Sequence, residues 1–345
     1  KNDRETTPAK KGTGLIMLVG DMAIVLNLLS VSVLAFVIGI ATVAVVSRFV
    51  LFRLKQVSFN SQKFILWSLV SAPWWIAFSC IGYFMPYSLG FDKVFNISWF
   101  EDFAHWHHID IFSFSSWHAL TLLLALIYLA WRVTKTTFVR TKQSIALSSL
   151  LSFTDAQDAR TTNGNQYLLM PVKVPVAFTT GFISPKIYVS TGLQTQVSDE
   201  QLNIIVNHEL AHVTARDPLF KVLFTALASF YPSRIKQTLI EQYVLMTEKI
   251  ADNEVAKEYD HLDIAQTLID VARLQKALPT DCDQASVSYF GHDYTSLRVE
   301  GLLNPINKPS LTTIIITLAL LATMPVLAAS TVDSFHHFIE TFFIH

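Results

Sequence analysis

Long apolar stretches dominate the pattern of hydrophobic and polar positions along the chain. Four of them reach or approach the ~20 residues that a helix needs to cross a bilayer. They lie at about 30–52, 64–89, 117–131 and 311–329. An apolar extension runs from the first stretch back to Leu15, so 15–52 can also be interpreted as two short helices. Asp21 and Asn27 would make its first half a costly lipid-facing span, and we interpret that half as an extension of one span.

Basic residues beside the spans predict the orientation, because cytoplasmic loops carry an excess of Lys and Arg. They collect between the first two spans (Arg48, Arg53, Lys55, Lys63) and after the third (Arg132, Lys135, Arg140, Lys142). Both segments are therefore predicted to be cytoplasmic. The tail 330–345, which has no Lys or Arg, is predicted to lie outside. Basic residues near the N-terminus conflict with this orientation (Lys1, Arg4, Lys10, Lys11).

The spans divide the chain into three predicted parts. Residues 1–132 form an N-terminal membrane region with three spans and an outer loop at 90–116. Residues 133–310 are the one soluble segment long enough to hold its own core, and 311–345 contain the fourth span and a short outer tail. The first apolar run is too long for a signal peptide and lacks a clear cleavage site, which favours an uncleaved anchor.

The soluble segment has a strand-rich part followed by helices. Short β-branched and aromatic runs separated by Pro and Gly predict a small sheet from strands at 167–169, 174–178 and 186–189. Ser198, with Gln201 three residues later, predicts a capping box and a helix through about Val213. Asp217, followed by Pro218, predicts a new N-cap with Pro at the first helical position. Further helices are expected at 233–258 and 262–276, and together these elements predict an α+β domain attached to an α-helical membrane protein of about four transmembrane helices.

The composition agrees with a membrane protein and excludes several functions. Of the 345 residues, 51% are hydrophobic and only 15% are charged, which is too apolar for an ordinary soluble domain. A net charge of -1 provides no basic field for phosphates, so direct nucleic acid binding is not expected. Cys80 and Cys282 lie far apart in the sequence and give neither a disulfide framework nor a cysteine zinc cluster.

The segment from His208 to His212 reads His-Glu-Leu-Ala-His, the HExxH pattern, within the capped helix. Its two imidazoles, four residues apart, project from one face and can bind one metal ion, while Glu209 lies beside them to act on water. Two histidines on an ordinary amphipathic helix are the alternative interpretation. Catalytic zinc takes three protein ligands and keeps an open position, so the pattern requires a third ligand.

Glu248 is the candidate for the third ligand. Asp252 follows it four residues later on the same helical face, where its carboxylate can accept a hydrogen bond from a ligating imidazole and fix its tautomer. The alternative is a solvated acidic face, which Glu241 and Glu254 also occupy. The chemistry predicted from these residues is zinc-assisted hydrolysis of a peptide bond, with Glu209 taking the proton of water.

A donor for the oxyanion that develops during hydrolysis is also expected. The candidates are His261, His292, Tyr294 and Arg298. Spacing does not rank them, and each is expected at the surface.

The chain resembles the BlaR/MecR-type membrane zinc metallopeptidases, the sensor-transducers of bacterial β-lactam resistance and their relatives. The resemblance rests on Gly181–Leu193, Asn207–Leu219 with its HExxH pattern, Glu248–Asp252 and Arg298–Pro305, and on three spans before and one after the catalytic segment. It implies His208, His212 and Glu248 as ligands of one Zn²⁺ ion and Glu209 as the catalytic base. It also implies a zincin-like protease domain on the cytoplasmic side of the bacterial inner membrane.

The family resemblance further implies a protease that an outside signal activates and that cleaves itself or a small transcriptional repressor encoded nearby. The sequence departs from the β-lactam sensors because it ends at His345, about 15 residues after the fourth span, without a penicillin-binding domain or a Ser-x-x-Lys motif there. We therefore expect a signal other than β-lactam acylation.

Two other functions remain open. An HtpX-type quality-control protease shares the HExxH pattern and the downstream Glu and Asp, but it typically has two spans before the catalytic segment. A non-catalytic signalling receptor would lack ligands or base, and none is missing here. The cluster His105-Trp106-His107-His108 in the outer loop can be a metal or pH sensor or simply an interfacial group, as can the pair His336-His337 in the tail.

Overall fold

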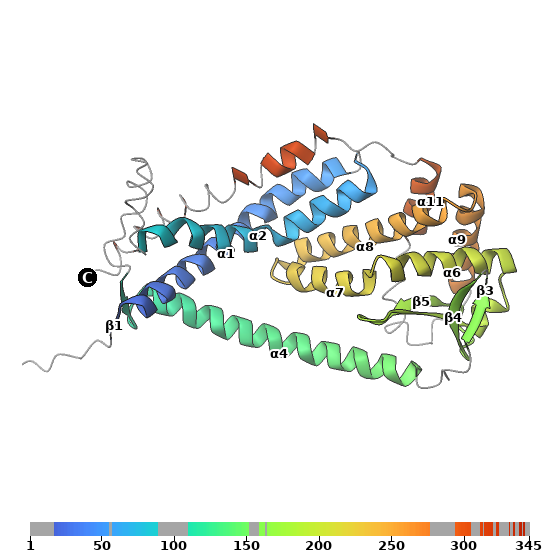
Figure 1. The fold of residues 1–345 in the computed structure, drawn as a ribbon, viewed down its shortest axis with the longest axis horizontal. Helices are drawn as coiled ribbons and strands as arrows, with labels where there is room; N and C mark the ends of the chain where they lie inside the picture. The colour runs from blue at the N-terminus through green and yellow to red at the C-terminus, as the bar shows by residue number, and fades with distance from the viewer. Residues whose placement is uncertain are drawn as a thin grey trace, which may run out of the picture. The chain divides into compact units, whose positions relative to one another are not determined.

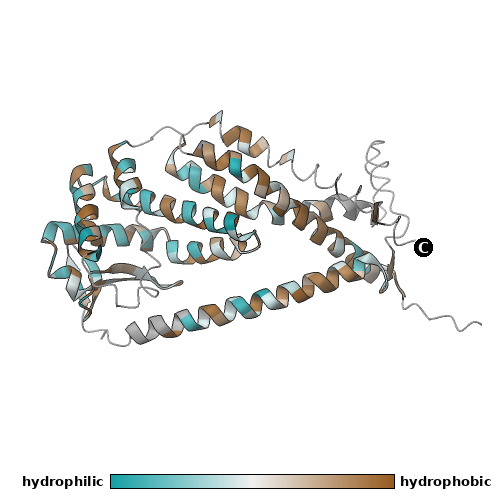
Figure 2. Ribbon diagram, turned by 180° about the vertical axis from the view of Figure 1, so that it is seen from behind, coloured by the Kyte–Doolittle hydropathy of each residue, from teal (hydrophilic) through white to brown (hydrophobic). Residues whose placement is uncertain are grey.

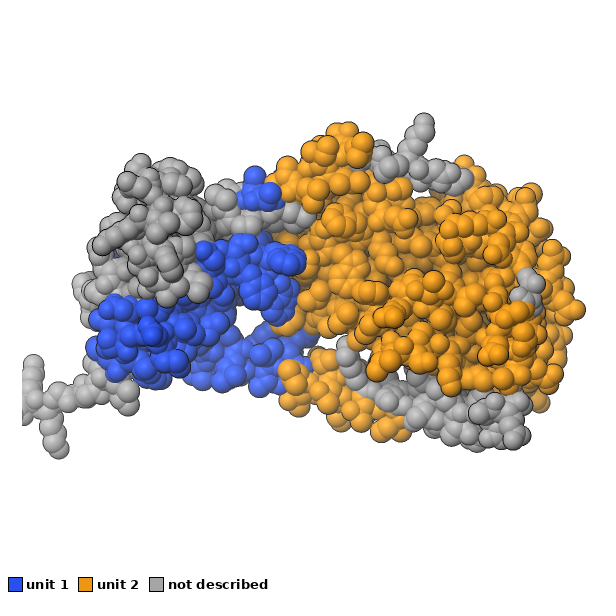
Figure 3. Space-filling view, in the orientation of Figure 1, with its two compact units in different colours: residues 1–39, 73–132, 322–345 blue, residues 40–72, 133–321 orange. Residues whose placement is uncertain are grey.

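The computed structural model describes residues 17–54, 57–88, 110–151, 159–162, 164–276 and 294–304, with short pieces between 311 and 341 (Figure 1). It divides into two compact units, coloured separately in Figure 3. One unit comprises residues 1–39, 73–132 and 322–345. The other comprises residues 40–72 and 133–321 and contains the HExxH pattern and Glu248. The second unit therefore includes the ends of the first two apolar helices as well as the soluble segment.

Three helices among the described residues are long and apolar enough to cross a membrane. They are α1 (Asp21–Leu54), α2 (Phe59–Ser88) and the first 23 residues of α4 (Trp117–Leu151). Hydrophobic residues predominate on α1 and α2, whereas α4 is mostly hydrophobic in its first part and mixed further along (Figure 2). One helix therefore accounts for residues 21–54, and the alternative of two short helices there is wrong. Of the fourth predicted span at 311–329, the structure describes residues 311–312, 314–319 and 322–323, which are helical, and the span stays a prediction.

Two short strands lie at the ends of the apolar helices. β1 (Met17–Val19) precedes α1 and pairs antiparallel with β2 (Ile111–Ser113), which precedes α4. The extension that we predicted back to Leu15 is thus partly a strand, and the helix begins at Asp21. The cluster at 105–108 and the pair at 336–337 lie outside the described residues.

The soluble segment begins with a four-stranded sheet. Its strands are β3 (Ala159–Thr162), β4 (Asn165–Met170), β5 (Ala177–Thr180) and β6 (Lys186–Ser190), in the order β3-β4-β6-β5. β4 and β6 are parallel, and the other two pairs are antiparallel. Gly181, with φ of +115°, forms the turn after β5, where a Cβ atom would come within 2.7 Å of the Ser184 carbonyl oxygen. β5 begins at Ala177, so the strand predicted at 174–178 lies too early in the sequence.

Helices follow the sheet. They are α5 (Thr191–Gln194), α6 (Asp199–Thr214), α7 (Asp217–Ala228), α8 (Ser233–Val255), α9 (His261–Lys276) and α11 (Thr295–Leu303). Ser198 caps α6 with the predicted capping box, because its side chain accepts from the Gln201 amide and the Gln201 side chain accepts from the Ser198 amide.

The helix that carries the HExxH pattern is held by two small cores. One face of α6 packs on the sheet with buried side chains that include Tyr167, Val189 and Val206. Ile204, on another face, packs against Val255 and Leu302. Because α6 contacts both the sheet and the helices α8 and α9, the positions of His208 and His212 are fixed by packing on several sides.

Candidate metal centre

The two histidines of α6 face each other one turn apart. Their Nε2 atoms are 3.2 Å apart, and their rings are nearly perpendicular at 88°. Only 13% of the His208 side chain and 7% of the His212 side chain are exposed. The capping of α6 and its packing therefore bring two imidazole nitrogens together in a buried place, as the HExxH spacing predicts.

Glu248 on α8 completes a group of three. Its Oε2 lies 3.3 Å from Nε2 of His208, and its Oε1 lies 3.6 Å from Nε2 of His212. Zinc bonds of about 2.0–2.1 Å at tetrahedral angles place ligand atoms about 3.3–3.4 Å apart. The three side chains therefore have the donor types and the spacing that a zinc ion requires, and they can hold one.

Each histidine has a carboxylate at its other ring nitrogen. Nδ1 of His208 lies 3.0 Å from Oδ1 of Asp252, and Nδ1 of His212 lies 2.8 Å from Oδ2 of Asp217. A carboxylate at Nδ1 keeps the proton there and directs the lone pair of Nε2 toward the other donors. Asp252 thus has the contact that we predicted for it, whereas Asp217 contacts an imidazole that the sequence did not link to it.

The corner between α6 and α7 places Asp217 under His212. Arg216 occupies the left-handed region, with φ of +52°, and is the N-cap of α7 without a side-chain cap hydrogen bond. Asp217 is therefore the first residue of α7, and our prediction of Asp217 as the N-cap with Pro218 at the first helical position is wrong by one residue. This shift leaves the carboxylate free to turn back toward His212, where 4% of it is exposed.

Arg298 is a buried part of the same centre. Its Nε and Nη2 lie 2.8 and 2.6 Å from the two carboxylate oxygens of Asp252, and its Nη1 lies 3.3 Å from Glu248. Only 17% of its side chain is exposed, so the expectation of a surface residue is wrong. α11 carries it into the site because Leu302, on the same short helix, is buried against Ile204 and Val255.

The charges of the site shift the pKa values of its groups. Burial lowers the pKa of His212, but Glu248 and Asp217 outweigh this effect and raise it to about 9. Burial and Arg298 lower the pKa of His208, yet hydrogen bonds with Asp252 and Glu248 leave it above the ordinary value. Without a metal ion His212 therefore favours the protonated form at neutral pH, and His208 holds its proton more tightly than an ordinary histidine.

Two of the carboxylates that face these histidines, those of Glu248 and Asp252, have pKa values shifted in the opposite direction. Burial raises the pKa of Glu248, but the charges of Lys221 and His212 hold it well below the usual range. Burial raises the pKa of Asp252 as well, but Arg298 dominates and lowers it to about 2. Both groups are therefore ionised at neutral pH, in the state that binds cations.

Glu209 is oriented by the edge of the sheet. The hydroxyl of Thr179 on β5 donates to Oε2 of Glu209, at 2.8 Å, and also lies 3.1 Å from the Glu209 carbonyl oxygen. The HExxH pattern does not identify this contact, because Thr179 precedes Glu209 by 30 residues and belongs to another element. A side-chain carboxylate held beside a group of metal-binding atoms can accept a proton from water.

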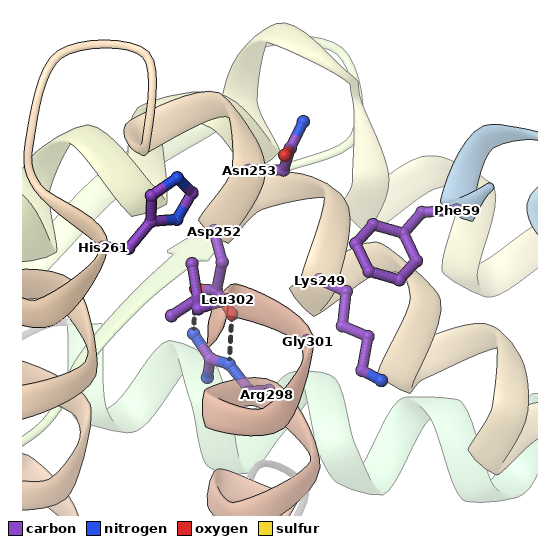
Figure 4. A pocket seen from close by; sticks show the side chains of 8 residues that line it. All are labelled: Phe59, Lys249, Asp252, Asn253, His261, Arg298, Gly301 and Leu302. Carbon is purple, nitrogen blue, oxygen red and sulfur yellow. Dashed lines mark hydrogen bonds and ion pairs between the residues drawn. The ribbon is translucent and has the colours of Figure 1, made fainter. Parts of the chain in front are cut away.

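The other candidate oxyanion donors have different positions. His261 lines a small pocket together with Asp252, Arg298 and residues of three helices (Figure 4). The group of His208, His212 and Glu248 is not part of this lining. Tyr294 immediately precedes α11, and His292 lies outside the described residues. Lys221, which the sequence analysis missed, has its Nζ 3.2 Å from Oε1 of Glu248.

Comparison with known families gives one match. A model of the family described as BlaR1 peptidase M56 matches residues 102–272, a segment that contains the group of three side chains and Glu209. Searches among curated proteins and among solved structures found no match.

Proposed function

The chain belongs to the BlaR1 peptidase M56 family through residues 102–272, and from this we propose that it is a zinc-dependent membrane endopeptidase. The observation that carries the proposal is the spacing of His208, His212 and Glu248. Their donor atoms are separated by 3.2–3.6 Å, close to the edge of a zinc tetrahedron, and both histidines have a carboxylate at Nδ1. An ordinary amphipathic helix does not require either feature.

In this proposal His208, His212 and Glu248 hold one Zn²⁺ ion, and Asp252 orients His208. The ion would act as a Lewis acid that lowers the pKa of water and polarises the peptide carbonyl. Arg298 has Nε and Nη2 on Asp252 and Nη1 on Glu248, so we assign it to holding these carboxylates rather than to the oxyanion.

We assign the proton transfer to Glu209. Thr179 donates to Oε2, which fixes the plane of the carboxylate and leaves Oε1 to take the proton from water. The same carboxyl group then delivers the proton to the nitrogen of the leaving amine. Since both transfers use one group, replacing Glu209 by Gln removes them without removing a donor to the metal ion.

The edge strand β5 suggests how a protein substrate binds. Among the described residues β5 is paired only with β6, so the backbone groups of its other edge are available to an extended peptide. Thr179 on β5 touches Glu209, so a peptide added beside β5 would pass the proposed base. Main-chain hydrogen bonds of this kind bind segments of many sequences, which agrees with an endopeptidase.

The family resemblance suggests the cellular setting. We propose that the protease domain is cytoplasmic, in the bacterial inner membrane, and that an outside signal leads it to cleave itself or a transcriptional repressor encoded nearby. The family match supports this function over an HtpX-type protease. The complete set of ligands and the base support it over a receptor without activity.

The test compares wild type, Glu209→Gln and Glu254→Gln in membranes. Glu254 is an exposed glutamate on α8 that pairs with Lys257, so its variant controls for the loss of one charge. Cleavage of the chain itself and of the neighbouring repressor is followed by electrophoresis, and bound zinc is measured on the purified proteins. We expect equal zinc in all three and cleavage in wild type and Glu254→Gln alone. Cleavage by Glu209→Gln, or a wild type without zinc, would refute the proposal.

A further inference from the structure

Each carboxylate behind a proposed zinc ligand has a cation of its own. Asp252 has Arg298, and Asp217 has Lys63, whose Nζ lies 3.1 Å from Oδ1 of Asp217. We call His208, Asp252 and Arg298 the His208 arm, and His212, Asp217 and Lys63 the His212 arm. Lys63 lies 154 residues before Asp217, on α2, within the stretch of that helix that is apolar enough to cross a membrane.

The part of α2 that carries Lys63 is packed firmly on the soluble helices. Residues 40–72 and the soluble segment form one compact unit. Trp67, one turn after Lys63, makes edge-to-face contacts with the rings of Phe224 and Tyr243, at 5.4 and 5.9 Å between centroids. Phe224 and Tyr243 are stacked on each other and fully buried, so this contact is a core and fixes the rotation of α2 about its axis.

A backbone contact fixes the same part of α2 along its axis. Pro73 has no N–H group, so it cannot bond the carbonyl of Leu69 four residues earlier as an ordinary helical residue would. The hydroxyl of Tyr231, which follows α7, donates to this carbonyl at 2.8 Å and is buried. Because of the proline, the Leu69 carbonyl lacks its usual helical N–H donor, and the Tyr231 hydroxyl of the soluble segment donates to it instead. This hydrogen bond requires α2 to lie at its present position along its axis.

The chemistry of a metal ligand explains why Asp217 needs a cation. A histidine that binds zinc through Nε2 is a neutral imidazole, so it gives its Nδ1 proton to Asp217 without balancing the charge of the carboxylate. An ionised carboxylate that is 4% exposed is costly unless a positive group pairs with it. Lys63 is the group that pairs with it, as Arg298 pairs with Asp252.

We infer that Lys63 is a positioning residue for the zinc ligand His212, acting through Asp217, and that it links the position of α2 to the geometry of the metal site. This inference rests on the proposed function, since it takes His212 to be a zinc ligand. A movement of α2 that breaks its packing on Phe224 and Tyr243 and withdraws Lys63 would leave the charge of Asp217 unbalanced and orient the imidazole less firmly. The position of α2 can thereby affect the geometry of the proposed metal centre through Lys63 and Asp217.

The test measures metal binding by the full-length chain in detergent or nanodiscs. The variants are Lys63→Met, Lys63→Arg and, as a control, Lys257→Met, which removes an exposed lysine paired with Glu254. Zinc affinity is determined by competition with a chelator, and the visible spectrum of the Co²⁺-substituted protein reports the ligand geometry. Thermal unfolding is recorded for each variant, and Lys63→Gln replaces Lys63→Met if the latter does not fold.

We expect Lys63→Met to lower zinc affinity about tenfold, the lower end of the range for residues that orient metal ligands, and to change the Co²⁺ spectrum. Lys63→Arg should keep most of the wild-type zinc affinity and a Co²⁺ spectrum close to that of wild type. Lys257→Met should match wild type in both measurements. If Lys63→Met binds zinc as wild type does and has the same Co²⁺ spectrum, the inference is wrong while the proposed function stands. A wild type that binds no zinc would instead overturn the proposed function.

Discussion

The two arms behind the proposed metal centre have the same chemistry but come from different parts of the chain. In the His208 arm, Arg298 makes two short contacts with Asp252 and comes from α11, a helix of the soluble segment. In the His212 arm, Lys63 makes one contact of 3.1 Å with Asp217 and comes from an apolar membrane helix. A guanidinium fork fixes a carboxylate in a plane, whereas an ammonium acts as a point charge on a flexible stem. The His208 arm is therefore the rigid one, and the His212 arm is the one that a membrane helix can adjust.

The largest difference between the arms is expected in folding stability. Arg298→Met leaves the carboxylate of Asp252, 2% exposed, without its cation, and breaking a buried pair in this way costs about 3–5 kcal/mol. Lys63→Met should cost less, because 22% of the Lys63 side chain is exposed and water can partly replace it. Denaturant unfolding of the purified chain measures both. Equal losses would remove the distinction between a rigid and an adjustable arm.

The pH dependence tests the His212 arm in particular. The pKa of His212 is raised from 6.5 to about 9 in the metal-free fold, so the folded state binds more protons than the unfolded state in that interval. The stability of the metal-free chain should therefore fall as the pH rises from about 6.5 to about 9. Zinc binds only the neutral imidazole, so zinc affinity should rise over the same interval, about tenfold per pH unit for each proton displaced.

Thermal unfolding in chelator and zinc titrations at several pH values measure these two opposite slopes. Asp217→Asn is the informative variant, because the hydrogen bond with Asp217 helps to raise the pKa of His212. In Asp217→Asn, both the stability of the metal-free chain and the zinc affinity should depend less on pH than in wild type. Slopes that run in the same direction in wild type would contradict the assignment of His212 as a group that zinc deprotonates.

A third comparison replaces the carboxylate of each arm by its amide. Asp217→Asn and Asp252→Asn should each lower zinc affinity by about 10–100-fold, since each replaces the charged acceptor behind a proposed ligand by a weaker, neutral amide oxygen. The two variants should differ in stability, because Asp252→Asn removes the charge that Arg298 contacts through Nε and Nη2, whereas Lys63 can turn toward water. Chelator competition and denaturant unfolding on the same samples separate the effects. An unchanged affinity in either variant would show that its arm does not support the metal.

The smallest expected effect concerns the corner that aims Asp217. Arg216 is exposed and has φ of +52°, which costs a residue with a Cβ atom about 1–2 kcal/mol. Glycine relieves this strain but loses about 0.5–1 kcal/mol through chain entropy, so Arg216→Gly should stabilise the fold by roughly 0.5–1 kcal/mol. Zinc affinity should stay within about twofold of wild type. A destabilised variant would indicate that the Arg216 side chain has a role of its own.

Local patterns predicted the parts of the site that lie within one helix. Short-range helical geometry, which four or five residues determine, sets three of these features. They are the cap of α6, the spacing of His208 and His212, and the spacing of Glu248 and Asp252. The Asp217 contact was missed because its neighbour Pro218 suggested a cap, while the left-handed Arg216 shifts the helix start by one residue.

Residues from distant segments could not be assigned from spacing. Lys63 entered the sequence analysis as one of several basic residues beside a span, and Arg298 as a surface residue. Only the packing of α2 on α7 and α8, and of α11 on α8 and α9, brings them to the site. β3 was missed because its Ala-Arg-Thr-Thr sequence has no alternation of apolar and polar residues. In the sheet, as in the site, the sequence pattern alone did not identify every member.

The separation of Lys63 from Arg298 along the chain also has a consequence for biosynthesis. The ribosome synthesises the chain from its N-terminus, so α2 is made long before α6. Arg298, which binds Asp252, is made only when α11 is synthesised. A nascent chain that ends between α6 and α11 holds the HExxH helix but lacks Arg298, the cation of the His208 arm. The proposed proteolytic centre would thus be completed late, after the apolar helices α1, α2 and α4 have been synthesised, and an unfinished chain would have little opportunity to cut itself or its neighbours.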